Sequence, residues 1–181
     1  MPASASKPPW NLDLLRFPKA LDDDPRLPEL RARLGSRREQ LWAGGALQVP
    51  VVSWSEPLAS ALASAQREGH VLQGVEQAER ALDREAHGLS LADARSRTER
   101  GSRVSRLLLT SNDGTERFYR QVERLLRTQG QRLLALRLDA DARQLSAVLG
   151  EPDGLARALL VEHKTSVARV LLALCESGAA A

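Results

Sequence analysis

The chain has 181 residues, of which 43% are hydrophobic, and its formal net charge is +3 at pH 7, so it has enough apolar residues for one domain with a sizeable core. The single cysteine, Cys175, excludes an internal disulfide and a cysteine metal cluster and is typical of proteins in a reducing compartment. No apolar run approaches the roughly 20 residues that span a membrane, and the first residues lack the apolar stretch of a secretory signal. We therefore expect a cytoplasmic protein without a membrane partner, and its Arg, Ala and Leu-rich composition favours a bacterial source.

The first hundred residues mainly predict helices. Residues 1–9 are rich in Ser, Ala and Pro and predict a disordered tail. Apolar residues then recur at helical spacing in four segments, residues 10–21, 27–41, 58–65 and 71–82. Residues 49–54 are β-branched and could form a short strand, which Pro50 would confine to the edge of a sheet. We expect residues 10–100 to form a helical extension packed on the rest of the chain.

Three apolar runs organise the second half of the chain. They lie within expected strands near residues 106–111, 132–138 and 157–162, and segments with helical spacing separate them. Strands joined by helical crossovers run parallel, and such crossovers are almost always right-handed. The sequence therefore predicts an α/β fold in which residues 101–177 form a three-layer α/β/α module with a parallel sheet, followed by a frayed tail at residues 178–181.

Polar residues follow each of the expected strands. Ligands of open parallel sheets bind beyond the carboxyl ends of the strands. The candidate site at this edge comprises Asn112, Asp113, Asp139, Asp141, His163 and Lys164. Its carboxylates and imidazole could in principle hold a divalent cation, but helix capping by Asp113 and Asp141 accounts for two of them, and no metal site is expected.

The usual motifs of catalysis and cofactor binding are missing from the sequence. Neither a Gly-x-x-x-x-Gly-Lys-Ser/Thr loop nor a Gly-x-Gly-x-x-Gly run follows a strand. Cys175 falls near the apolar face of the last expected helix, as a buried structural cysteine would. We therefore expect no cofactor and no enzymatic activity.

Arginine dominates the basic residues, because the three lysines leave 23 arginines among 26. Arginine favours two-pronged contacts with phosphate. A cluster of arginines precedes the first expected strand, and together with the loop after the last strand it forms our predicted nucleic-acid-binding surface. Its residues are Arg95, Arg97, Arg100, Arg103, Arg106, His163 and Lys164.

A second basic stripe occupies the helix that follows the first strand. Arg117, Arg120, Arg124 and Arg127 fall on one helical face. Glu116 and Glu123 stand four residues before Arg120 and Arg127, a spacing that predicts ion pairs and leaves a solvated face as the alternative to phosphate binding. Only Tyr119 is expected to be a spare aromatic residue here, so base stacking is not expected.

Residues 106–174 resemble the small α/β/α-sandwich ribosomal proteins and their relatives that bind kink-turn RNA. The likeness rests on Leu109-Thr110-Ser111-Asn112-Asp113, the element from Leu145 to Gly150, and Val161-Glu162-His163-Lys164. In that family the loop after the last strand helps to contact RNA, which implies this role for His163 and Lys164. The family's RNA-reading motif, Gly-x-Asn-Glu followed by Thr-Lys, is absent, and the matching region reads Gly88-Leu89-Ser90-Leu91-Ala92-Asp93.

Two functional hypotheses follow. The first is a non-enzymatic protein that binds RNA or joins a ribonucleoprotein. The alternative is a protein-interaction or regulatory adaptor, which would engage a protein partner through the amphipathic helices of residues 58–82 and 10–21. A phosphorylatable receiver domain is a further analogy, through Asp113, Asp139 and Lys164 at strand ends, but the usual adjacent acidic pair is absent.

Overall fold

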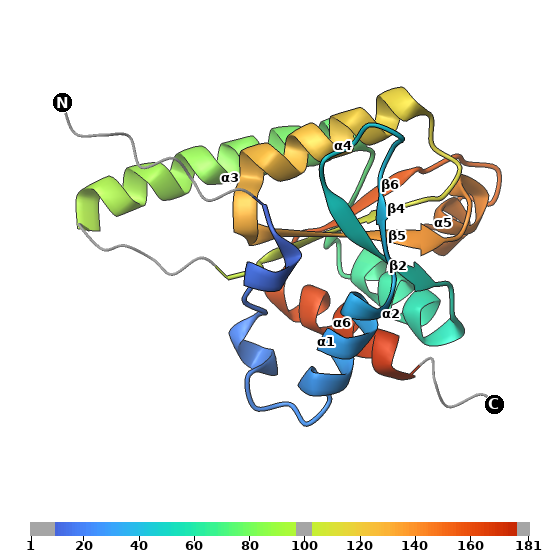
Figure 1. Ribbon diagram of the computed structural model, residues 1–181, viewed down its shortest axis with the longest axis horizontal. Helices are drawn as coiled ribbons and strands as arrows, with labels where there is room; N and C mark the ends of the chain where they lie inside the picture. Colours follow the sequence, from blue (N-terminus) through green and yellow to red (C-terminus); the bar gives the residue numbers. More distant parts are fainter. Residues whose placement is uncertain (1–9, 97–102, 177–181) are drawn as a thin grey trace.

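A computed structural model describes residues 10–96 and 103–176 (Figure 1). Its mixed sheet has the strand order β1-β2-β5-β4-β6-β3. The strands are β1 (Arg38–Gln40), β2 (Gln48–Ser53), β3 (Val71–Gln73), β4 (Arg106–Thr110), β5 (Leu133–Asp139) and β6 (Ala158–Val161). The helices are α1 (Leu27–Ser36), α2 (Glu56–Arg67), α3 (Val75–Ser96), α4 (Glu116–Gln129), α5 (Ala142–Val148) and α6 (Lys164–Glu176), and short 3-10 turns cover Leu12–Leu14, Lys19–Leu21 and Gly130–Arg132.

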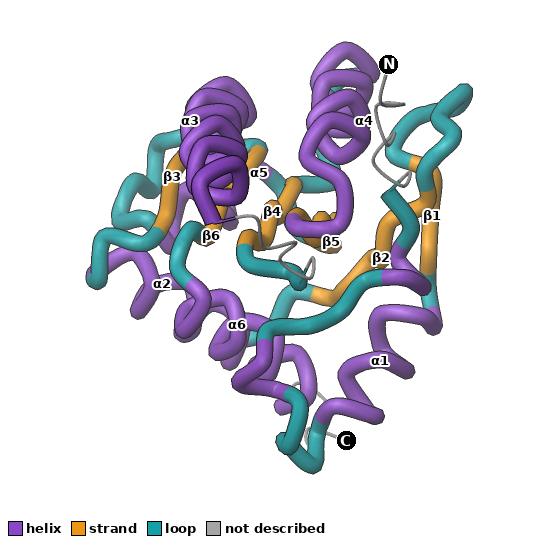
Figure 2. Tube along the Cα trace, turned by 90° about the vertical axis from the view of Figure 1, so that its left-hand side faces the viewer, coloured by secondary structure: helices purple, strands orange, loops and turns teal. Residues whose placement is uncertain are grey.

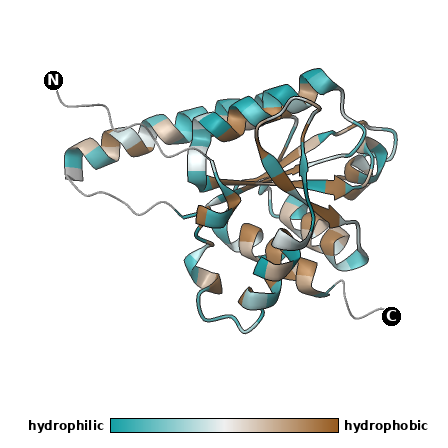
Figure 3. Cartoon of the chain, in the orientation of Figure 1, coloured by the Kyte–Doolittle hydropathy of each residue, from teal (hydrophilic) through white to brown (hydrophobic). Residues whose placement is uncertain are grey.

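The elements form three layers, which confirms the predicted α/β fold. Helices α3 and α4 cover one face of the sheet, and α1, α2 and α6 cover the other (Figure 2). Because both faces are covered, the central strands must be apolar on both sides, and Leu107, Leu108 and Leu109 of β4 are all fully buried. Figure 3 shows the hydrophobic residues gathered along the sheet, with hydrophilic residues on the outer sides of α3 and α4. No helix in the described residues is long and apolar enough to cross a membrane.

The prediction that all three C-terminal strands are parallel is wrong for β6. Strands β4 and β5 are parallel, but β6 pairs with β4 in the antiparallel direction, with Leu107 opposite Val161. The connecting helices differ in length in a way that matches this difference in direction. Helix α4 has 14 residues and extends about 21 Å, enough to return along the sheet, whereas the 7 residues of α5 extend only about 10 Å. The chain therefore stays at the edge where β5 ends, and β6 runs back from there.

The expected helical extension is part of the sheet. Residues 10–100 supply β1 and β2 at one side of the sheet and β3 at the other, with β2 parallel to β5 and β3 antiparallel to β6. Strand β2 is not an edge strand, as Pro50 suggested it would be, because β1 lies outside it. The proline is accommodated because the pairing of β2 with β5 begins only at Val51. The helix expected over residues 27–41 ends at Ser36, and the start of the one expected from residue 71 is β3. The predicted tails, residues 1–9 and 178–181, lie outside the described residues.

The segment before α1 is anchored in the core. Trp10 is only 4% exposed, and its indole Nε1 donates a hydrogen bond to the carbonyl oxygen of Leu133, at 2.7 Å. Leu15, Phe17 and Leu21 are also buried. Of the four residues whose spacing predicted an amphipathic helix here, Trp10, Phe17 and Leu21 therefore belong to the protein's own core, and Leu14 is exposed.

Candidate nucleic-acid interface

Four of the six sheet-edge residues meet where β4 and β5 end. The Asn112 amide donates to the carbonyl of Ala140 (2.9 Å), and a carboxylate oxygen of Asp113 accepts from the Ala142 amide (3.2 Å). Asp141 is the N-cap of α5, as predicted. Burial would raise the pKa of Asp113, but hydrogen bonds such as that from the Ala142 amide outweigh it and hold the pKa below its ordinary value. These carboxylates therefore cap a helix.

The other two residues of that expected site, His163 and Lys164, lie at the opposite edge of the sheet. Because β6 is antiparallel to β4, the chain leaves β6 beside the beginning of β4. The His163 ring stacks there on His70, with ring centres 4.3 Å apart. Asp139, the last residue of β5 at the first edge, does not cap a helix and pairs with Arg37 (2.6 Å). Within residues 10–96 and 103–176, no group of three His, Cys, Asp or Glu side chains is placed to hold a metal ion.

A serine, a histidine and a glutamate meet beside this imidazole stack. The hydroxyl of Ser166 and a carboxylate oxygen of Glu68 lie 2.8 and 3.2 Å from the same nitrogen, Nδ1 of His70. A catalytic triad uses the two ring nitrogens for different partners. Ser166 is fully buried, and Arg169 pairs with Glu68 at 2.6 Å. The contacts therefore join the α2–β3 connection to α6 and do not form a triad.

The arginine cluster before β4 makes mainly structural contacts where the chain is described. Arg103 pairs with Asp22 at 2.8 Å, and Arg106 pairs with Glu85 at 2.7 Å. Arg95 is exposed near the end of α3, while Arg97 and Arg100 lie outside the described residues. The antiparallel β6 does place Arg106 at the same edge as His163 and Lys164, but its charge is engaged by a carboxylate.

The arginines of α4 divide into two pairs. The predicted helical ion pairs are present, with Arg120 at 2.6 Å from Glu116 and Arg127 at 2.7 Å from Glu123. Arg117 and Arg124 are exposed, and neither makes an ion pair with the part of the chain that the structure describes. Both line a polar groove of about 420 Å³ between α3 and α4. Its lining residues are Glu76, Glu116, Arg117, Arg120, Gln121 and Arg124.

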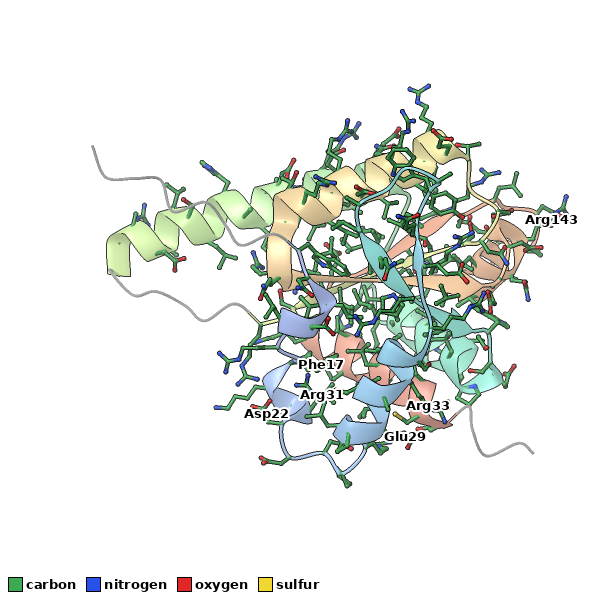
Figure 4. The ribbon with its side chains drawn as sticks, in the orientation of Figure 1. Phe17, Asp22, Glu29, Arg31, Arg33 and Arg143 are labelled. Carbon is green, nitrogen blue, oxygen red and sulfur yellow. The ribbon has the colours of Figure 1, made fainter. Side chains whose placement is uncertain are left out.

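Helix α3 adds two further arginines to this side of the molecule. Arg80 and Arg84 lie one and two turns after Glu76, so they follow the same side of the helix. Both are exposed, and neither has an ion-pair partner among the described residues. Figure 4 shows nitrogen-tipped side chains projecting from the outer surfaces of α3 and α4. We call Arg80, Arg84, Arg117 and Arg124 the arginine face.

A tryptophan from the β1–β2 connection, Trp42, contacts side chains of α4, which sequence reasoning missed. The Arg120 guanidinium carbon is 4.3 Å from the centre of the Trp42 ring, and the Trp42 indole donates to Glu123 at 3.0 Å. The segment containing Trp42 was interpreted as the end of a helix, and no local pattern links it to a helix so far along the chain. Tyr119, the expected spare aromatic residue, is 4% exposed and donates to the carbonyl of Ser111, so it belongs to the core.

Comparisons with known proteins add little to this geometry. No protein-family model matches the chain. None of the curated proteins matches it either. A solved structure of a protein with unknown function from Bacillus halodurans C is similar to it, with 14% sequence identity and a TM-score of 0.48, covering 67% of this chain and 99% of that one.

Proposed function

We propose that this protein binds RNA, alone or within a ribonucleoprotein, without catalysing a reaction, and that the arginine face contacts the phosphates. The observation that carries the proposal is the set of four exposed arginines on two adjacent helices, none of which has an ion-pair partner among the described residues. A guanidinium group presents planar donors that match phosphate oxygens. Arginines held in intramolecular ion pairs, such as Arg103 and Arg106, would first have to give up a carboxylate.

The adaptor alternative has less support, because the apolar faces on which it depends are buried in the protein itself. Leu58 and Leu62 of α2 are fully buried, as is Leu21 of the N-terminal segment at 1% exposure. Among the residues that the structure describes, the large hydrophobic side chains that remain exposed are scattered single ones, namely Leu14, Leu91 and Leu155. Isolated exposed leucines are normal on a soluble protein and do not make a docking surface.

The proposal predicts that the double variant Arg117→Glu with Arg124→Glu binds RNA at least tenfold more weakly than the wild type. Its log–log salt slope should also become shallower by about 1.5, since two phosphate contacts are lost. The measurement is fluorescence anisotropy of a labelled RNA oligonucleotide over a series of salt concentrations. Thermal melting checks that the variant is folded, which is expected because both side chains are exposed.

The matched control is Arg67→Glu with Arg143→Glu, which makes the same charge change on α2 and α5. Both residues are exposed, and Arg143 projects away from α3 and α4 (Figure 4). The control should stay within about twofold to threefold of the wild type, since only long-range attraction is reduced. Equal losses in both double variants would mean a general effect of net charge, and unchanged binding in the first would also refute the proposal.

A further inference from the structure

Arg120 lies at the side of the α3–α4 groove and contacts both an aromatic ring and a carboxylate. One of its contacts is the Trp42 ring, 4.3 Å from the guanidinium carbon, and another is the Glu116 carboxylate at 2.6 Å. Its side chain is nevertheless 58% exposed, and it lines the groove, whereas Trp42 does not. The guanidinium therefore has backing on the Trp42 side and access to solvent on the groove side.

Trp42 is itself fixed in place. Its indole donates to the buried carboxylate of Glu123, which also accepts from the Ala46 amide at 3.2 Å. Gly44 lies so close to the ring that a Cβ there would be 2.5 Å from the Trp42 Cζ3 atom. The connection between β1 and β2 thus holds the tryptophan in place, and its ring supports one side of the Arg120 guanidinium.

The Arg120 guanidinium, which is supported by an aromatic ring, can serve a purpose other than attracting phosphate. Phosphate attraction needs only charge, which the exposed Arg117 and Arg124 supply. An unpaired base, by contrast, stacks on an aromatic ring or on an arginine plane. The groove has about 420 Å³ of space, within the range of sites that accept a molecule the size of a nucleotide.

We infer that the groove receives an unpaired nucleotide of the RNA, whose base stacks on Arg120 with Trp42 as the positioning residue behind it, while Arg117 and Arg124 contact neighbouring phosphates. The inference rests on the proposed function and adds the class of ligand, which is single-stranded or bulged RNA and not a continuous duplex. Tyr119 was the one aromatic residue expected to be available for base stacking, but it is buried. The inferred stacking surface is instead the exposed side of the Arg120 guanidinium.

The test compares a ten-nucleotide adenine RNA with an abasic oligonucleotide of the same length, which has the same phosphates but no bases. Wild-type protein should bind the adenine RNA at least fivefold more tightly, since stacking of one base is worth about 1–3 kcal/mol. Arg120→Lys keeps the charge and removes the plane, and Trp42→Leu removes the backing. Both should lose the preference for bases and keep the wild-type affinity for the abasic oligonucleotide.

Arg143→Lys is the matched control, because it makes the same exchange at an exposed arginine that does not line the groove, and it should keep the preference. Loss of the preference in this control, or its survival in both Arg120→Lys and Trp42→Leu, would overturn the inference. If wild-type protein binds both oligonucleotides equally, stacking is refuted while phosphate binding stands. If it binds neither, the proposed function fails as well.

Discussion

Replacing Trp10 with alanine should lower the free energy of unfolding by about 4 kcal/mol, in the range of other buried tryptophan truncations. Trp10 is 4% exposed, and its indole hydrogen bond reaches the carbonyl of Leu133, where β5 begins. Alanine leaves a cavity and deprives that carbonyl of its indole donor. Urea denaturation followed by circular dichroism measures the effect, and the loss should appear as a lower midpoint with little change in slope.

Trp10→Phe separates the two contributions. Phenylalanine fills most of the space and lacks the donor, so it should cost only about 1–2 kcal/mol. If both variants cost less than 1 kcal/mol, the segment from Trp10 to α1 does not contribute to the core as the structure describes. An equal loss of unfolding free energy in the two variants would instead mean that the hydrogen bond accounts for the whole effect.

Replacing Glu123 with alanine should cost about 3 kcal/mol at pH 7, because the variant removes one partner of a buried charged network. Glu123 is 5% exposed and accepts hydrogen bonds from Arg127, the Ala46 amide and the Trp42 indole. Alanine leaves the Ala46 and Trp42 donors without that acceptor. The measurement is again the free energy of unfolding in urea.

The cost should also depend on pH. Burial alone would raise the pKa of Glu123, but hydrogen bonds from Arg127 and the Ala46 amide outweigh it and hold the pKa below its ordinary value of 4.5. The unfolded chain therefore binds this proton more readily than the folded chain. The contribution of Glu123 is complete above the unfolded pKa and is lost as the pH falls through the folded pKa.

The difference between wild type and Glu123→Ala should accordingly shrink when the urea titrations are repeated at pH 3 to 3.5. Glu116→Ala is the control, since Glu116 stands at the same spacing from an arginine but is 57% exposed. An exposed ion pair of this kind contributes at most about 0.5 kcal/mol. A Glu123 effect that is the same at both pH values would contradict the ionised network.

The sequence was enough to predict the fold class and the positions of β4, β5 and β6 along the chain. Its local patterns do not indicate in which direction each strand runs in the sheet. The short α5 was the available signal for the direction of β6, because the 7 residues of β5 rise about 23 Å and those of α5 only about 10 Å, so a parallel β6 would have required residues 149–157 to cover the rest. The assignment of β3 failed because Val71 and Val75 fit one helical stripe. Gly74, at φ +92°, marks the true boundary between strand and helix.

The candidate site was predictable in part. Spacing alone predicted the ion pairs of Arg120 and Arg127, which the structure contains. Spacing could not show that Arg103 and Arg106 face carboxylates from distant segments. Nor could it place Trp42 beside Arg120, because that contact depends on how the β1–β2 connection crosses to α4.

The order of strands in the sheet has a consequence for how the protein is made. Strands β2 and β3 leave the ribosome long before β5 and β6, the neighbours to which they pair. Until those later segments emerge, β2 can pair only with β1, and β3 lacks the strand to which it pairs in the folded protein. Native sheet assembly therefore waits until translation is nearly complete, and the nascent chain exposes its apolar segments for most of its synthesis.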